Sequence, residues 1–161
     1  SSLDEEHSGL QQARPYNRNR NHNNTEDRKA MRRIQVSTQS RSQMVNITGQ
    51  VQREIQASGI SEGICVVYVP HTTAGIFINE GADPSVMDDL ETTLDRMVPW
   101  NGPYRHGEGN AAAHVKATLV GESVTVIVKE GRLQLGTWQA VFLAEFDGPR
   151  SRSVWVRIIP A

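Results

Sequence analysis

Three histidines carry most of the chemistry that the sequence offers, because an imidazole binds a metal ion or moves a proton near neutral pH. His71 follows a proline at the end of an apolar run, His106 lies in a glycine-rich stretch, and His114 lies in a short alanine-rich segment. None belongs to a helical pair with the spacing of a zinc motif. Their positions at the edges of predicted elements favour a functional site, and the alternative is three hydrogen-bonded structural histidines.

Hydroxyls and carboxylates follow His71 along the chain. Thr72 and Thr73 come directly after it, and hydroxyls with free backbone N–H groups at such a turn bind phosphate. An ordinary bend is the alternative. Farther on, Asp83 is explained as a helix cap, whereas Glu80 has no such explanation and is the better candidate for catalysis.

The segment 131–139 is unusual for a plain strand. It combines a cation, Arg132, with amide side chains and the indole of Trp138. A cation and an aromatic face are groups that bind a charged ligand. The alternative interpretation is a tight turn followed by a core tryptophan.

Two polar or reactive residues lie in runs that we interpret as buried strands. Glu145 interrupts an apolar run, and a buried carboxylate needs a partner, for which Arg150 or Arg152 is available. Cys65 is the single cysteine, so it forms no internal disulfide, and its apolar neighbours indicate a buried, inert thiol.

The apolar pattern predicts the elements that position these residues. Thr48 is the predicted N-cap of a helix whose apolar face recurs every four residues, and Asp83 with Pro84 opens a second helix that Pro99 ends. We expect Val86, Met87, Leu90, Leu94 and Met97 to form the buried stripe of that second helix. The predicted strands are 33–36, 44–47, 63–69, 74–79, 123–128, 133–146 with a break near Gly136, and 153–159, and the predicted helices are 48–57, 84–98 and 110–119.

Composition and order of elements define the fold class. The chain has 161 residues, of which 37% are hydrophobic, and residues 1–30 hold almost no apolar run. We interpret 1–30 as a polar, disordered extension or leader and 31–161 as a single domain. Strands and helices do not alternate strictly, which favours an α+β fold with antiparallel or mixed sheets.

Charge and hydropathy restrict the partners. The net charge is −1, which indicates neither nucleic acid nor a membrane surface as a partner. No run reaches the roughly 20 apolar residues of a membrane span, and no secretory signal is apparent. We therefore expect a cytoplasmic protein that acts on a small molecule.

Three blocks of residues, taken in order, resemble the YjbQ-like family of secondary thiamine-phosphate synthases. The similarity extends over essentially all of 31–158, and three blocks in register are far more specific than any one motif. The blocks are His71–Gly75 with Asn79–Glu80 and Asp83–Pro84; Tyr104–His106 with His114–Ala117; and Gly131–Leu133 with Leu135–Gln139 and Glu145–Phe146.

The resemblance implies a three-layer α+β fold with helices packed on one side, assembled as a homotrimer. It implies coupling of a pyrimidine pyrophosphate to a thiazole phosphate, with release of pyrophosphate. It also implies a site near His71, His106 and His114 that binds an anion or a divalent metal, Zn or Mg. On this interpretation His71, His114 and Glu80 are catalytic, and Thr72, Thr73, Lys116, Arg132 and Trp138 bind the phosphorylated substrates.

One departure from the family pattern bears on metal binding. Family members often carry an acidic residue shortly before the histidine of the second block, whereas residues 110–113 here read Asn-Ala-Ala-Ala. Without that carboxylate, His114 lacks a metal co-ligand or an orienting acceptor. Two further functions stay open: a metal-assisted phosphoester hydrolase, and a non-enzymatic trimer that binds an anion or a metal.

Overall fold

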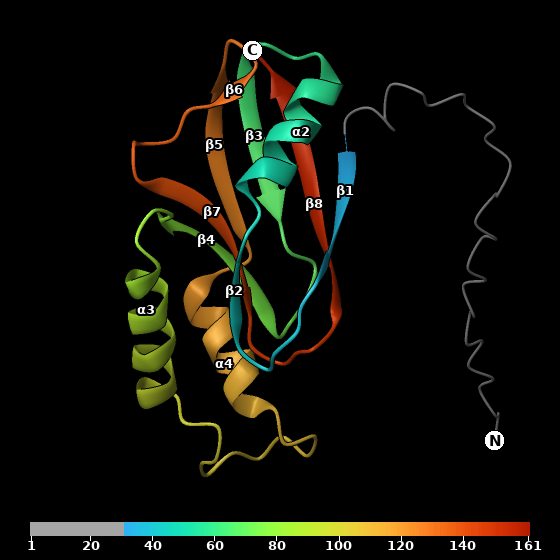
Figure 1. Ribbon diagram of the computed structural model, residues 1–161. Helices are drawn as coiled ribbons and strands as arrows, with labels where there is room; N and C mark the ends of the chain where they lie inside the picture. The colour runs from blue at the N-terminus through green and yellow to red at the C-terminus, as the bar shows by residue number, and fades with distance from the viewer. Residues whose placement is uncertain (1–30) are drawn as a thin grey trace, which may run out of the picture.

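Two antiparallel sheets form the framework of the protein (Figure 1). The computed structural model describes residues 31–161, and the predicted extension 1–30 lies outside the described residues. The five-stranded sheet has the order β1-β8-β3-β5-β6, and the three-stranded sheet has the order β2-β7-β4. The strands are β1 (Met31–Ser37), β2 (Gln43–Asn46), β3 (Gly63–Tyr68), β4 (Ala74–Glu80), β5 (Ser123–Lys129), β6 (Arg132–Leu133), β7 (Gln139–Glu145) and β8 (Ser151–Pro160), and the helices are α2 (Thr48–Ser58), α3 (Pro84–Met97) and α4 (Ala111–Val120).

The main core lies between the two sheets and α2. In β1, β5 and β8 buried and exposed residues alternate, because successive side chains of a strand point to opposite faces. The buried face of the five-stranded sheet packs on α2 through Val51 and Ile55, and on the three-stranded sheet through residues such as Val141 and Leu143. Strand β7 is buried along nearly its whole length, since the main core covers one face and a second core the other.

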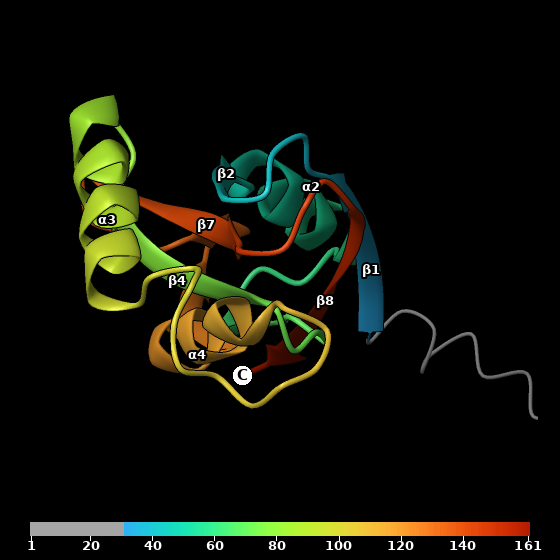
Figure 2. The same ribbon diagram turned by 90° about the horizontal axis from the view of Figure 1, so that it is seen from below.

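The second core joins the three-stranded sheet to the helices on its far side, as Figure 2 shows for α3 and α4. Ala113 and Ala117 of α4 pack against Ala144 and Phe146, and the small alanines let the helix approach the sheet closely. The predicted α+β class with antiparallel sheets is therefore confirmed.

The helix starts agree with the sequence in one case and differ in the other. Asp83 caps α3, and its side chain accepts a hydrogen bond from the Ser85 N–H at 3.0 Å. The predicted N-cap role of Thr48 is wrong, because the cap position is Ile47 and the Thr48 N–H itself donates to Asn46 Oδ1 at 3.1 Å. The Thr48 hydroxyl instead accepts a hydrogen bond from the Val141 N–H at 2.8 Å, which ties α2 to β7.

The stripe of α3 is less buried than its periodicity predicts. No residue of the helix is buried, and Met97 is 65% exposed. The helix α3 packs along a sheet of only three strands. That sheet is too narrow to bury the whole apolar stripe of the helix. Within residues 31–161, no helix combines the length and the hydropathy needed for a membrane span.

Candidate active site

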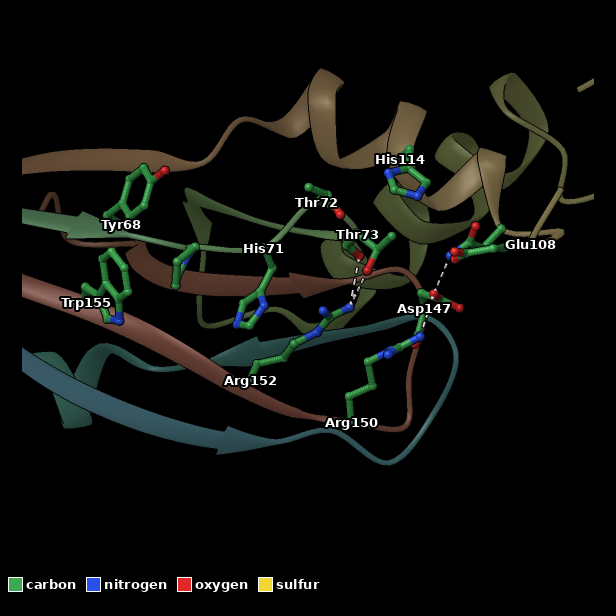
Figure 3. Close-up of a pocket in the computed structure, with 12 residues that line it drawn as sticks. Tyr68, His71, Thr72, Thr73, Glu108, His114, Asp147, Arg150, Arg152 and Trp155 are labelled. Atoms are coloured by element: carbon green, nitrogen blue, oxygen red, sulfur yellow. Dashed lines mark hydrogen bonds and ion pairs between the residues drawn. The ribbon is translucent and has the colours of Figure 1, made fainter. Parts of the chain in front are cut away.

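A polar pocket of about 550 Å³ lies where three segments distant in sequence meet. These are the loop after β3, the start of α4, and the turn between β7 and β8 (Figure 3). The segments bring together hydrogen-bond donors, acceptors and two aromatic rings in one open cavity. The lining residues are Tyr68, Pro70, His71, Thr72, Thr73, Glu108, Asn110, His114, Asp147, Arg150, Arg152 and Trp155.

A buried ion pair fixes one wall of the pocket. Arg152 Nε donates to both carboxylate oxygens of Glu145, at 2.9 and 3.1 Å, and neither side chain is more than 5% exposed. The Thr38 hydroxyl donates to the same carboxylate at 2.7 Å. Burial alone would raise the pKa of Glu145, but the hydrogen bonds from Arg152 and Thr38 outweigh it and lower that pKa. The expected arginine partner of Glu145 is thus confirmed, and it is Arg152.

The Arg152 guanidinium also lines the pocket, and not all of its N–H groups are used in the ion pair with Glu145. Arg152 Nη2 donates to Thr73 Oγ1 at 2.8 Å, so the buried Thr73 holds the arginine in place. Nη1 of Arg152, like Nη1 of the neighbouring Arg150, has no protein partner among residues 31–161 and is not sealed from solvent. The Nη1 groups of these two arginines are therefore available to donate hydrogen bonds to an anionic ligand.

A backbone hydrogen bond fixes the protonation state of the His71 ring. Its Nε2 accepts a hydrogen bond from the Ser153 N–H at 2.9 Å, which requires an unprotonated Nε2 and places the ring proton on Nδ1. Burial and the nearby charge of Arg152 lower the pKa of His71 below its ordinary value of 6.5. At neutral pH the imidazole therefore offers an Nδ1–H group and carries no charge.

We expect the stability of the protein to fall as the pH decreases from 7 to 5, in part through His71. Because the folded-state pKa is lowered, the unfolded chain binds the proton more readily, so the contribution of His71 is complete above about pH 6.5 and is lost below it. Urea unfolding of the wild type and His71→Gln at pH 7 and pH 5 measures this, because glutamine accepts the Ser153 bond without titrating. Equal pH dependence of the two proteins would refute the assignment.

The pocket also presents acceptors, which lie next to Arg150. Asp147 Oδ2 receives Arg150 Nη2 and Asn110 Nδ2, both at 2.9 Å. Glu108 lines the pocket beside them and lies 3.7 Å from His106 Nε2. Glu108 thus places a carboxylate near His114, although residues 110–113 contain none. The pocket therefore combines cationic donors with carboxylate and amide acceptors.

The predicted site residues divide between this pocket and other surfaces. His71, Thr72, Thr73 and His114 are brought together, and Figure 3 shows their common position. His106 lines a neighbouring cavity of about 190 Å³, with its ring centroid 5.0 Å from that of His114. Glu80 does not join the histidines: it lies at the far end of β4, about 20 Å along the strand from Ala74, and lines a different cavity.

The three remaining predicted residues also lie elsewhere. Lys116 is buried and paired with Asp95 of α3, so its ammonium group joins two helices. Arg132 lines a separate groove beside α2. Trp138 is not a core residue but 65% exposed, in the loop before β7.

The donor set of a single chain does not fit the expected three-histidine metal site. Among the described residues, no three His, Cys, Asp or Glu side chains form a group that could hold a metal ion. The Nε2 atom of His71, a natural ligand atom, is already occupied by the Ser153 N–H. Metal binding therefore stays a prediction, and no chemical step below depends on it.

Neither the acceptors of the pocket nor its two arginines were predicted as site residues from the sequence. Asp147, Asn110 and Glu108 had no predicted role, and Arg150 and Arg152 were considered only as partners for Glu145. The available signal was the polar run Asp147–Arg152 directly after a buried strand, a position where sites are commonly built.

Comparison with known proteins identifies the family of the chain. A sequence model described as UPF0047 protein YjbQ-like matches residues 32–161. The chain therefore belongs to the YjbQ-like UPF0047 family. It is 50% identical to the UPF0047 protein MJ1081 of Methanocaldococcus jannaschii over 131 residues, which cover 81% of this chain and 95% of the relative. It is 46% identical to the UPF0047 protein YugU of Bacillus subtilis, over 80% and 98% of the two chains.

Solved structures of similar proteins share the fold. The crystal structure of a YjbQ/UPF0047 protein from Clostridium acetobutylicum has a TM-score of 0.78 and 48% identity, and the match covers 79% of this chain and 98% of that one. The structure of a hypothetical protein from Aeropyrum pernix has a TM-score of 0.78 at 38% identity, over 81% and 98% of the two chains. The fold and the family of the chain are thus shown.

Proposed function

We propose that the protein is a transferase of the thiamine-phosphate synthase type, which couples a pyrimidine pyrophosphate to a thiazole phosphate. The observation that carries this proposal is the donor wall of the pocket, where unpaired Nη1 groups of Arg152 and Arg150 lie beside the His71 imidazole and the Thr72 hydroxyl. Such a set suits a phosphoryl group. The resemblance to secondary thiamine-phosphate synthases supplies the identity of the two substrates.

The reaction needs stabilisation of a leaving anion rather than a strong base. The thiazole nitrogen attacks the methylene carbon of the pyrimidine, the carbon–oxygen bond breaks, and its electron pair leaves with pyrophosphate. Arg152 and Arg150 oppose the growing negative charge from fixed positions, and the Nδ1–H of His71 donates to a leaving oxygen. Two aromatic rings that line the same pocket, Tyr68 and Trp155 with centroids 5.7 Å apart, offer a face for the pyrimidine ring.

We also propose that the chain works as a homotrimer, as the family resemblance implies. The support within the chain is an apolar row on the outer face of the five-stranded sheet, where Ile64 pairs with Ile127 and with Ile159. All three side chains are exposed, and a single-chain protein gains nothing from presenting such a row to water.

Product analysis tests the activity. With both substrates present, the wild type is expected to form thiamine phosphate and pyrophosphate in equal amounts, detected by mass spectrometry. Arg150→Met is expected to lower the coupling rate at least tenfold, because it removes a donor from the leaving-group wall. Arg132→Met is the matched control, since that arginine lies outside the pocket, and its rate should stay within about twofold of the wild type.

The alternatives give different products. Release of free phosphate without a thiazole substrate would indicate a hydrolase, and binding of pyrophosphate without turnover would indicate a non-enzymatic anion-binding protein. Equal losses in Arg150→Met and Arg132→Met would mean that the pocket is assigned to the wrong place.

A further inference from the structure

The segment 84–109, which we call the strap, lies almost entirely on the surface of the protein. It consists of α3 and the loop 98–109, which curves around the start of α4 (Figure 2). Its one buried side chain is Val98, which is 7% exposed, and every other residue of the strap is exposed or half-buried. A segment with so few buried contacts opens locally at a lower free energy than the whole protein unfolds.

The two ends of the strap differ in how firmly they are held. Just before its start, the Gly81 N–H donates to the Trp138 carbonyl at 2.8 Å, and a Cβ atom at Gly81 would lie 2.5 Å from the Cβ atom of Ala140. At its end, Gly109 has a φ of 76°, and no atom lies within 4 Å of a Cβ placed at Gly107 or Gly109. The start is therefore packed closely on β7, whereas the end has room to move.

A buried cation of α4 holds the strap in place. The Lys116 side chain is 4% exposed, and its ammonium group forms an ion pair and a hydrogen bond with Asp95 of α3, whose side chain is 62% exposed. Asp95 is the only hydrogen-bond partner of that ammonium among the described residues, and the centroid of the Phe146 ring lies 5.9 Å from Nζ. An ammonium group has three N–H donors, so the burial of Lys116 depends on a carboxylate that the strap supplies.

The remaining contacts of the strap are with the second core and with the loop before β2. Leu94 and Trp100 pack against the second core. The Arg41 guanidinium lies 4.2 Å from the centroid of the Trp100 ring, and the Ser42 hydroxyl donates to Glu91 at 3.4 Å. None of these side chains is buried, so losing their contacts costs less free energy than losing contacts of the core.

We propose that the strap is a lid over the polar pocket and that the Lys116–Asp95 ion pair is the latch that keeps it closed. Glu108, near the free end of the strap, lines the pocket (Figure 3). When the ion pair opens, the loop 98–109 moves away with Glu108, the pocket widens toward solvent, and Lys116 becomes hydrated. This inference goes beyond the proposed function and does not depend on which ligand the pocket binds.

Hydrogen exchange of the unaltered protein tests whether the strap opens by itself. The amides of α3 are expected to exchange at least about 100-fold faster than those of β3 and β8, because they need only the local opening. Low urea should accelerate the exchange of β3 and β8 and leave that of α3 nearly unchanged, since local opening exposes little surface. Equal rates with equal urea dependence would show that the strap opens only when the whole protein unfolds, and would overturn the inference.

Substitutions in the ion pair test the latch. Asp95→Asn is expected to speed both α3 exchange and tryptic cleavage after Arg96 and Arg105 by at least about tenfold, because Lys116 stays buried only with a charged partner. Asp89→Asn removes an exposed carboxylate of the same helix that belongs to no ion pair among residues 31–161, and both rates should stay within about twofold of the wild type. Adding Lys116→Met to Asp95→Asn should return both rates to within about threefold of the wild type, because no charge is left to bury.

Each outcome decides one part of the inference. Rates for Asp95→Asn equal to those for Asp89→Asn would exclude the latch. Faster α3 exchange without faster cleavage after Arg105 would show that the helix alone frays and would exclude the lid, because Arg105 lies in the loop that carries Glu108. A double variant that opens as readily as Asp95→Asn would show that the buried charge does not control the opening. If Asp95→Asn does not fold, the exchange of the unaltered protein still decides whether the strap opens.

Discussion

Replacing Arg152 by methionine is expected to destabilise the protein by about 3–5 kcal/mol, because it leaves the Glu145 carboxylate buried without its cation. Glu145 is fully buried, and Arg152 supplies both a charge and three hydrogen bonds to it. The pKa of Glu145, now held below its ordinary value, should rise once the arginine is gone. Urea unfolding at pH 7 measures the loss.

Two further variants make that measurement specific. Arg150→Met removes an exposed arginine of the same turn, whose ion pair with Asp147 lies at the surface, and should cost less than about 1 kcal/mol. Adding Glu145→Gln to Arg152→Met should recover more than half of the lost stability, because the unpaired charge is removed. If Arg152→Met is no less stable than Arg150→Met, the buried pair does not hold the pocket wall in place.

Much of the fold could be predicted from local pattern. The β-branched run before Pro70, the alternation in 153–159 and the cap at Asp83 each report a structure that neighbouring residues determine. Thr48 was misread because its hydroxyl bonds to Val141, a residue 93 positions away that no local pattern indicates. The exposure of the α3 stripe was likewise unpredictable, since periodicity identifies an apolar face but not the width of the surface that covers it.

Only those residues of the candidate site that are adjacent in sequence could be predicted from the sequence. His71, Thr72 and Thr73 are adjacent in sequence and remain adjacent in space, and the pattern found them. Asp147 and Arg152 reach the same pocket through the packing of β8 beside β3, a long-range pairing. Glu80 shares a strand with the residues after His71, but the strand carries it away from the pocket, because each residue of a strand adds about 3.3 Å.

The position of Trp138 illustrates a related limit. Two hydrogen bonds fix its loop, from the Gly81 N–H to the Trp138 carbonyl at 2.8 Å and from the Gly136 N–H to Gln139 Oε1 at 2.8 Å. The indole is nevertheless 65% exposed. A rigid loop that presents an aromatic ring to solvent is typical of a contact with another molecule. Trp138 lies outside the pocket of its own chain. The predicted role of Trp138 in substrate binding would therefore require a contact with another molecule.

The outer face of the five-stranded sheet offers a contact surface for the proposed trimer. Ile64, Ile127 and Ile159 are 44%, 65% and 48% exposed, and they lie in one row across three neighbouring strands. The opposite face of the same sheet already packs on α2 and on the second sheet. Burying this row against other copies would therefore remove three exposed isoleucine side chains from water.

Ile64→Lys is expected to convert the trimer to a monomer, because Ile64 is central in the row and a lysine there would be buried without a partner in the assembly. Light scattering after gel filtration should give about three times 17.9 kDa for the wild type and 17.9 kDa for the variant. Gln56→Lys adds the same charge on the exposed side of α2, whose other side packs into the core, and should leave the trimer intact. A trimeric Ile64→Lys protein would place the interface elsewhere, and a monomeric wild type would exclude the trimer itself.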